Sequence, residues 1–200
     1  MKQLIVYVHG KGGSATEAEH YKALFPNCGV YGFDYKAEKP WEAKTEFLQE
    51  FERLYKQQGK MILIANSIGA FFSMHAGIGD TVSKAYLISP IVNMEKLISD
   101  MMNWANVSEA ELSEKKEIKT EFGETLSWEY LTYVRKNPLV WNVPTKILYG
   151  EKDNLTSLET MKSFADKINA PVTVMPDGEH WFHTEEQMKF LDEWICVRGN

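Results

Sequence analysis

Short apolar runs alternate with longer segments of helical periodicity along most of this 200-residue chain. Such alternation is typical of α/β proteins, in which helices connect the strands of a parallel sheet. Most of the runs are continuously apolar, as expected for strands covered by helices on both faces. They lie at residues 4–8, 29–33, 61–65, 85–88, 146–149 and 172–175. We therefore predict an α/β fold with about six mostly parallel strands and helices on both faces.

One long segment, between the fourth and fifth of these runs, departs from the alternation. It shows no strand signal, and a loop of that length without secondary structure is rare in a compact domain. Three stretches within it have helical character, at residues 93–105, 108–119 and 127–136. The sequence thus predicts a single domain, residues 1–200, with a helical cap inserted at about residues 90–142.

The composition limits the classes of partner. With 22 basic and 28 acidic residues the net charge is −6, which gives no attraction to nucleic-acid phosphates or anionic lipid. No apolar stretch approaches the roughly 18 residues that a membrane-spanning helix needs, and the run at residues 4–8 is too short for a signal peptide. The two cysteines, Cys28 and Cys196, form no CxxC motif, which fits a reducing compartment. We expect a cytoplasmic protein that binds neither nucleic acid nor membranes.

A serine stands at the junction between a predicted strand and a predicted helix. In the pentapeptide Ala-Asn-Ser-Ile-Gly at residues 65–69, Ser67 is flanked two positions away by the small residues Ala65 and Gly69. Small residues there permit a sharp strand-to-helix turn that exposes the serine hydroxyl beside the Ile68 N–H. The pattern alone is weak, because a serine at this position is also a common helix N-cap.

Two later loops supply the groups that would activate a serine. The loop after the fifth predicted strand contains Asp153, and the loop after the sixth contains His180. Ligands of open α/β sheets bind at the carboxyl ends of the strands, where both loops lie. A serine nucleophile needs a base that is itself oriented by an acid. Glu151 and Asp177 are alternative acids by residue type, and His183 is the alternative base.

The loop after the first predicted strand is rich in glycine. Residues 9–14, with the sequence His-Gly-Lys-Gly-Gly-Ser, let the backbone approach a reacting carbonyl closely. A main-chain N–H here, at Lys11, would pair with the Ile68 N–H around an oxyanion. The same glycines, at residues 10–15, also match the dinucleotide pattern G-x-G-x-x-G/A, with Asp34 at the distance of a ribose-binding acid. A dinucleotide-binding protein is therefore an alternative, although it explains none of the later loops.

Taken in order, the His-Gly loop, the serine turn, the Gly-x-x-Asp loop and the late histidine resemble the small α/β-hydrolases. The resemblance extends from His9 to His180, essentially the whole chain. Three features depart from the family pattern. The chain starts at what would be the family's third strand, Ala65 replaces a commoner glycine, and Glu179 precedes the histidine where the family often has glycine.

The resemblance implies a role for each candidate residue. Ser67 would be the nucleophile, His180 the general base and Asp153 its orienting acid, with oxyanion N–H groups from Lys11 and Ile68. It implies hydrolysis of a small carboxylic ester, with thioesters and amides as alternatives, through an acyl-enzyme on Ser67. No cofactor or metal is implied, and the expected partner is a small-molecule acyl substrate.

Two further alternatives follow from the same residues. A zinc site is conceivable at His180 and His183, because acidic residues surround them, but no other His/Cys cluster supports it. These acidic residues are Glu179, Glu185 and Glu186. A catalytically silent binding protein of hydrolase shape is the other alternative, because a fold does not fix a function.

Overall fold

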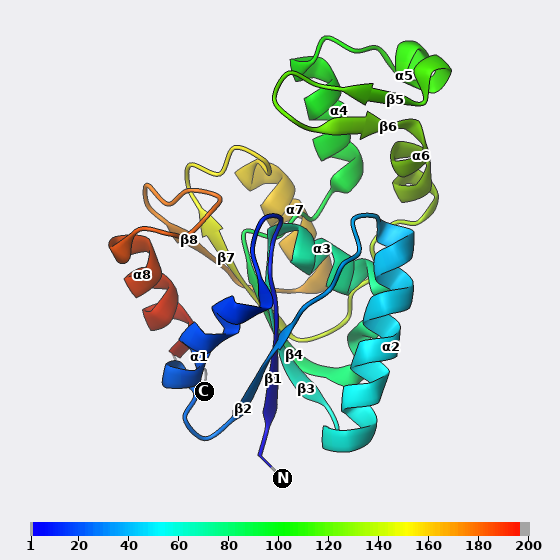
Figure 1. The fold of residues 1–200 in the computed structure, drawn as a ribbon. Helices are drawn as coiled ribbons and strands as arrows, with labels where there is room; N and C mark the ends of the chain where they lie inside the picture. The colour runs from blue at the N-terminus through cyan, green and yellow to red at the C-terminus, as the bar shows by residue number, and fades with distance from the viewer. Residues whose placement is uncertain (1, 197–200) are drawn as a thin grey trace. The chain divides into compact units, whose positions relative to one another are not determined.

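The computed structural model describes residues 2–196 and contains a six-stranded sheet in the order β2-β1-β3-β4-β7-β8 (Figure 1). Every neighbouring pair in this sheet is parallel, which confirms the predicted fold class. Each predicted strand is present within a few residues of its expected bounds. The strands are β1 (Leu4–Val8), β2 (Gly29–Phe33), β3 (Met61–Asn66), β4 (Val82–Ile88), β7 (Thr145–Gly150) and β8 (Val172–Met175).

The central strands form the core of the sheet because their side chains are apolar on both faces. Four of the five residues of β1 are buried, and in β3 Leu63, Ile64 and Ala65 are fully buried. Two-sided burial removes water from both faces of each ladder, so the backbone polar groups are satisfied by neighbouring strands. The carboxyl ends of β1, β3, β7 and β8 therefore hold their loops on a rigid frame.

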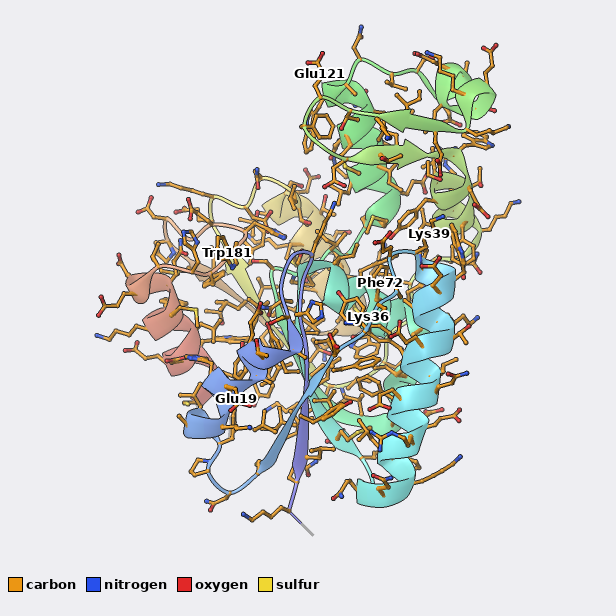
Figure 2. All side chains as sticks on the ribbon, viewed as in Figure 1. Glu19, Lys36, Lys39, Phe72, Glu121 and Trp181 are labelled. Atoms are coloured by element: carbon orange, nitrogen blue, oxygen red, sulfur yellow. The ribbon has the colours of Figure 1, made fainter. Side chains whose placement is uncertain are left out.

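Helices cover the sheet on both faces, with α1 and α8 on one side and α2 and α3 on the other (Figure 1). In α2, Pro40 occupies the first turn, Phe47 and Phe51 are fully buried, and Gly59 ends the helix with a φ of 76°. Phe72 of α3 packs edge-on against Phe47, which ties these two helices together (Figure 2). The helices of this part are α1 (Ala18–Leu24), α2 (Pro40–Gln58), α3 (Ser67–Ala76), α7 (Leu158–Ile168) and α8 (Glu185–Cys196), with 3-10 turns at Ala15–Glu17 and Ile78–Thr81.

The chain divides into two compact units, one of residues 2–92 and 140–196 and the other of residues 93–139. We call them the sheet unit and the inserted unit. The inserted unit contains helices where they were predicted and, in addition, a two-stranded antiparallel sheet. Its elements are α4 (Met94–Trp104), α5 (Glu109–Lys115), β5 (Glu117–Lys119), β6 (Thr125–Ser127) and α6 (Trp128–Lys136).

The prediction that this segment contains no strand was wrong. The helix expected to run to residue 119 ends at Lys115, because Lys116 adopts a left-handed φ of 68°. A hairpin follows, in which Ile118 pairs with Leu126. Its turn is closed by the Thr120 N–H donating to the Glu124 carbonyl and by the N–H of Gly123, which has a φ of 87°, donating to the Thr120 carbonyl. Strands of three residues are too short to show an alternating pattern, which is why these two strands could not be predicted.

Among the described residues, no helix has both the length and the apolar character needed to cross a bilayer.

Candidate active site

Ser67 lies at a strained turn between β3 and α3. Its φ of 47° is in the left-handed region, which costs a residue other than glycine on the order of 1 kcal/mol or more. Of the two small neighbours predicted for such a turn, Gly69 has a visible reason. A β-carbon on Gly69 would lie 2.2 Å from the His9 carbonyl oxygen, and one on Gly10 would lie 3.3 Å from the Ser67 β-carbon. The loop after β1 therefore packs directly against the serine turn.

Asp153 is held by the loop that follows β7. Its Oδ1 accepts hydrogen bonds from the Leu155 and Thr156 N–H groups at 2.8 and 3.0 Å. The Tyr149 hydroxyl donates to the Thr156 carbonyl at 2.8 Å and fixes the far side of the loop. The Asp153 side chain has no exposed area. Backbone donors hold one carboxylate oxygen in place, which leaves the other to face a separate partner.

The loop carrying His180 packs against the Asp153 loop at a point where only glycine fits. A β-carbon on Gly150 would lie 2.3 Å from the Glu179 carbonyl oxygen and 2.6 Å from that of Gly178. The Lys152 N–H donates to the Gly178 carbonyl at 2.7 Å and joins the two loops. The family resemblance placed glycine where Glu179 stands, but the Glu179 backbone fits because the space is provided by Gly150.

A continuous chain of hydrogen bonds links three of the predicted site residues. Ser67 Oγ lies 2.8 Å from His180 Nε2, and His180 Nδ1 lies 2.7 Å from Asp153 Oδ2. An ionised carboxylate can only accept, so Nδ1 carries the proton and donates to Asp153. Nε2 is then the acceptor for the Ser67 hydroxyl proton. This arrangement can remove that proton when the oxygen attacks an electrophile and can stabilise the imidazolium that results.

The alternative acids and base lie outside this chain. Glu151 Oε2 accepts from the Asp177 N–H at 3.0 Å, and Asp177 pairs with Lys152 at 2.6 Å, which lowers the Asp177 pKa. His183 stacks on Trp181, with ring centroids 4.3 Å apart, and Trp181 is 70% exposed. Trp181 is labelled in Figure 2. These groups pair with one another at the loop surface, whereas His180 contacts the Ser67 hydroxyl.

Of the two predicted oxyanion residues, Ile68 is next to Ser67 in the chain. The other, Lys11, follows Gly10, which packs against the Ser67 β-carbon. Ile68 lies in the first turn of α3, where helix N–H groups have no partner within the helix. Lys11 belongs to the turn after β1, which is closed by the Gly13 N–H donating to the Gly10 carbonyl at 3.1 Å. Gly12 has a φ of 75°, so the turn requires a residue that tolerates the left-handed region.

The residues of the alternative sites are arranged differently. Asp34, the candidate ribose-binding acid, is exposed and pairs with Lys36 at 2.8 Å. His183 Nδ1 lies 3.7 Å from Glu179, but His180 faces Ser67 and Asp153 instead. Within residues 2–196 no group of three or more His, Cys, Asp or Glu side chains is placed to hold a metal ion.

Sequence reasoning missed a polar pair next to the serine. Asn66 ends β3, and its side-chain Nδ2 donates to the buried Tyr7 hydroxyl at 2.9 Å. The available signal was a polar residue at the end of an otherwise apolar strand, directly before the candidate nucleophile.

No protein-family model matches this chain, and no curated protein matches it in sequence. Solved structures do match its fold. Mouse α/β hydrolase domain-containing protein 10 aligns with a TM-score of 0.77 and 16% identity over 98% of this chain and 88% of its own. Est1E from Butyrivibrio proteoclasticus aligns at 0.71 with 16% identity, over 97% and 85%. A Paleococcus ferrophilus monoacylglycerol lipase aligns at 0.62 with 17% identity, over 98% and 95%. The resemblance inferred from the motifs is thus confirmed at the level of architecture, and the chain has the α/β-hydrolase fold.

Proposed function

We propose that this protein is a serine hydrolase that cleaves small carboxylic esters through an acyl-enzyme on Ser67. The observation that carries the proposal is the hydrogen-bonded chain from Ser67 through His180 to the fully buried Asp153. If Ser67 only capped a helix, its hydroxyl would not need an imidazole at 2.8 Å. If His180 only filled space, its ring would not need a hydrogen bond to a buried carboxylate. Thioesters and amides are the alternative substrates, because the same attack applies to each acyl group.

The proposed reaction has two halves. Ser67 Oγ attacks the carbonyl carbon while its proton passes to His180 Nε2, and the carbonyl oxygen becomes an oxyanion held by the Ile68 and Lys11 N–H groups. The intermediate collapses by breaking the ester C–O bond, and His180 returns the proton to the leaving alkoxide. Water then attacks the acyl-enzyme with the same base, which releases the acid and restores Ser67. Asp153 keeps the imidazole oriented throughout.

The named structural relatives favour esters over other acyl compounds. They include esterases and a monoacylglycerol lipase, and Est1E has been solved with ferulic acid bound. We propose for this chain a small-molecule acyl substrate of the same general class, with residues 93–139 serving as the cap of the domain. The acyl chain length is open to direct measurement with a series of aryl esters from acetate to decanoate.

A fluorophosphonate probe tests the proposal because it reacts only with an activated serine. We expect one adduct per chain by intact mass, located on Ser67 by peptide mapping, and hydrolysis of at least one aryl ester. Ser67→Ala should abolish labelling and lower kcat by roughly 10³-fold or more while circular dichroism stays unchanged. Ser83→Ala is the matched control, because the Ser83 hydroxyl bonds the Met61 carbonyl at the amino end of the sheet. No adduct on folded wild-type protein, together with no ester turnover, would contradict the proposal and favour the silent binding protein.

A further inference from the structure

Three polar side chains form a second hydrogen-bonded chain beside the serine turn. Asn66 Nδ2 donates to the Tyr7 hydroxyl at 2.9 Å, and the same hydroxyl donates to Glu17 Oε2. The other carboxylate oxygen of Glu17 accepts from the Ser14 N–H at 3.0 Å. None of these residues belongs to the chain formed by Ser67, His180 and Asp153.

The direction of each bond is fixed by chemistry. The Glu17 carboxylate can only accept, so the Tyr7 hydroxyl proton points toward it. The Tyr7 oxygen is then left to accept, and only the NH₂ end of Asn66 can donate to it. Tyr7 remains protonated because burial, together with the nearby Glu17 charge, raises its pKa. The orientation of the Asn66 amide is therefore dictated from Glu17 through Tyr7.

The two ends of this chain lie on the two backbone segments proposed to hold an oxyanion. Asn66 directly precedes Ser67 and Ile68, so fixing its side chain fixes the start of the serine turn. Glu17 contacts the other segment, the loop of Lys11, by accepting a hydrogen bond from the Ser14 N–H. Its carboxylate lies so close to this loop that a β-carbon on Gly13 would be 2.6 Å from Glu17 Oε1. One carboxylate thus connects the loop of Lys11 to the turn of Ile68.

Packing alone does not explain why residue 7 is a tyrosine. Tyr7 is 1% exposed in the middle of the apolar core, where phenylalanine would occupy the same space without burying a hydroxyl. The Tyr7 hydroxyl both accepts and donates a hydrogen bond, and a buried hydroxyl bonded in this way specifies the arrangement of its two partners more strongly than apolar packing does. Here the partners are the segments whose spacing matters to the proposed reaction.

We propose that Glu17, Tyr7 and Asn66 form a positioning chain that sets the separation of the Lys11 and Ile68 N–H groups. The proposal rests on the function proposed above and adds residues to it. They are positioning residues, since they act through the backbone and touch no reacting atom. An oxyanion exists only during the reaction, so misplacing its donors should lower kcat and leave binding of the ester unchanged.

The test compares Tyr7→Phe with wild type in three measurements. We expect kcat for the best aryl ester to fall about 10- to 100-fold with KM unchanged, as for a misplaced oxyanion donor. Affinity for an alkyl trifluoromethyl ketone should fall by a similar factor, because its hemiketal oxygen occupies the oxyanion position. The matched control is Tyr31→Phe, which removes another hydroxyl that donates to a carboxylate, that of Glu50 at 2.7 Å, in a pair that lies on β2 and α2 and includes neither the serine turn nor the loop of Lys11. Its kcat should match that of wild type.

A second variant keeps the test decisive if Tyr7→Phe folds poorly. Glu17 is exposed, so Glu17→Ala should fold, and it should reproduce the loss of kcat and of ketone affinity. Combined with Tyr7→Phe it should add little, because both changes break one chain. Lower stability with unchanged kcat in both variants would overturn the positioning role and leave the esterase proposal intact. A wild-type protein without turnover or labelling would overturn both proposals together.

Discussion

The sheet unit and the inserted unit differ in how much of their secondary structure can be predicted from local sequence patterns. In the sheet unit every strand is an apolar run bounded by turn residues, and all six are found near their predicted positions. In the inserted unit the helices are found, but β5 and β6 are not predicted. A strand buried on both faces can be recognised from its apolar composition. A three-residue strand at the surface has no such pattern, because its conformation depends on the strand with which it pairs. The strands of this fold were therefore predictable because they are buried, more than because their residues have high strand propensity.

The two units also differ in what their charged groups do. In the sheet unit Asp153 is fully buried and oriented by two backbone N–H groups. In the inserted unit Arg135 bridges Glu95 and Glu109 at 2.7 Å, and all three side chains are substantially exposed. A buried, oriented carboxylate can act on a neighbouring imidazole, whereas an exposed ion pair is weakened by water and salt. The buried Asp153 carboxylate is placed to orient an imidazole, whereas the exposed ion pairs of Arg135 contribute modest stability.

The largest effect expected from this contrast follows from neutralising one carboxylate in each unit. Asp153→Asn should lower kcat roughly 10³-fold or more, because the imidazole loses both its orientation and the stabilisation of its charged form. Glu109→Gln should leave kcat within about twofold. Steady-state rates with one aryl ester measure both. Glu151→Gln serves as the control within the same loop, and a greater loss there than in Asp153→Asn would mean that the acid is misassigned.

The sequence supplied most of the candidate site because its loops follow recognisable strands. Ser67, Asp153 and His180 each come a few residues after an apolar run, so their common edge follows from parallel topology. The pairing of Asp177 with Lys152 and the stacking of His183 on Trp181 could not be predicted from spacing, because these contacts form only in the folded loops.

The bond between Tyr7 and Glu17 was equally hidden from the sequence. Locally, β1 is an apolar strand and Glu17 belongs to the 3-10 turn that follows Ser14. Their contact arises because α1 folds back over the face of the sheet that carries Tyr7, where Tyr21 packs on it at 5.1 Å. Local patterns cannot reveal which polar group a helix brings to a distant strand.

A smaller effect is expected from removing apolar contacts in the inserted unit. Leu112 is fully buried there, so Leu112→Ala should destabilise its surroundings by about 2–4 kcal/mol. Because residues 93–139 form their own compact unit, the loss should remain local. Hydrogen exchange should speed up within residues 93–139 and stay slow in β1 and β3. Leu63→Ala, at an equally buried position of β3, is the control and should accelerate exchange throughout the sheet. Equal acceleration everywhere in Leu112→Ala would show that the two units unfold as one.

The smallest effect concerns the ion pairs of Arg135, which join three helices of the inserted unit. Its Nε donates to Glu95 at 2.7 Å, and its two terminal nitrogens donate to the carboxylate of Glu109 at 2.7 and 2.8 Å. The paired geometry favours a real contribution, but exposure limits it, so Arg135→Gln should cost no more than about 1 kcal/mol. Salt separates charge from packing here: raising ionic strength from about 0.01 to 1 M shortens the Debye length from about 30 to 3 Å. The difference in exchange protection between wild type and Arg135→Gln should therefore shrink with added salt, whereas the effect of Leu112→Ala should persist. A salt-independent difference would mean that the Arg135 side chain stabilises α6 by covering apolar surface with its methylene groups, and not by its charge.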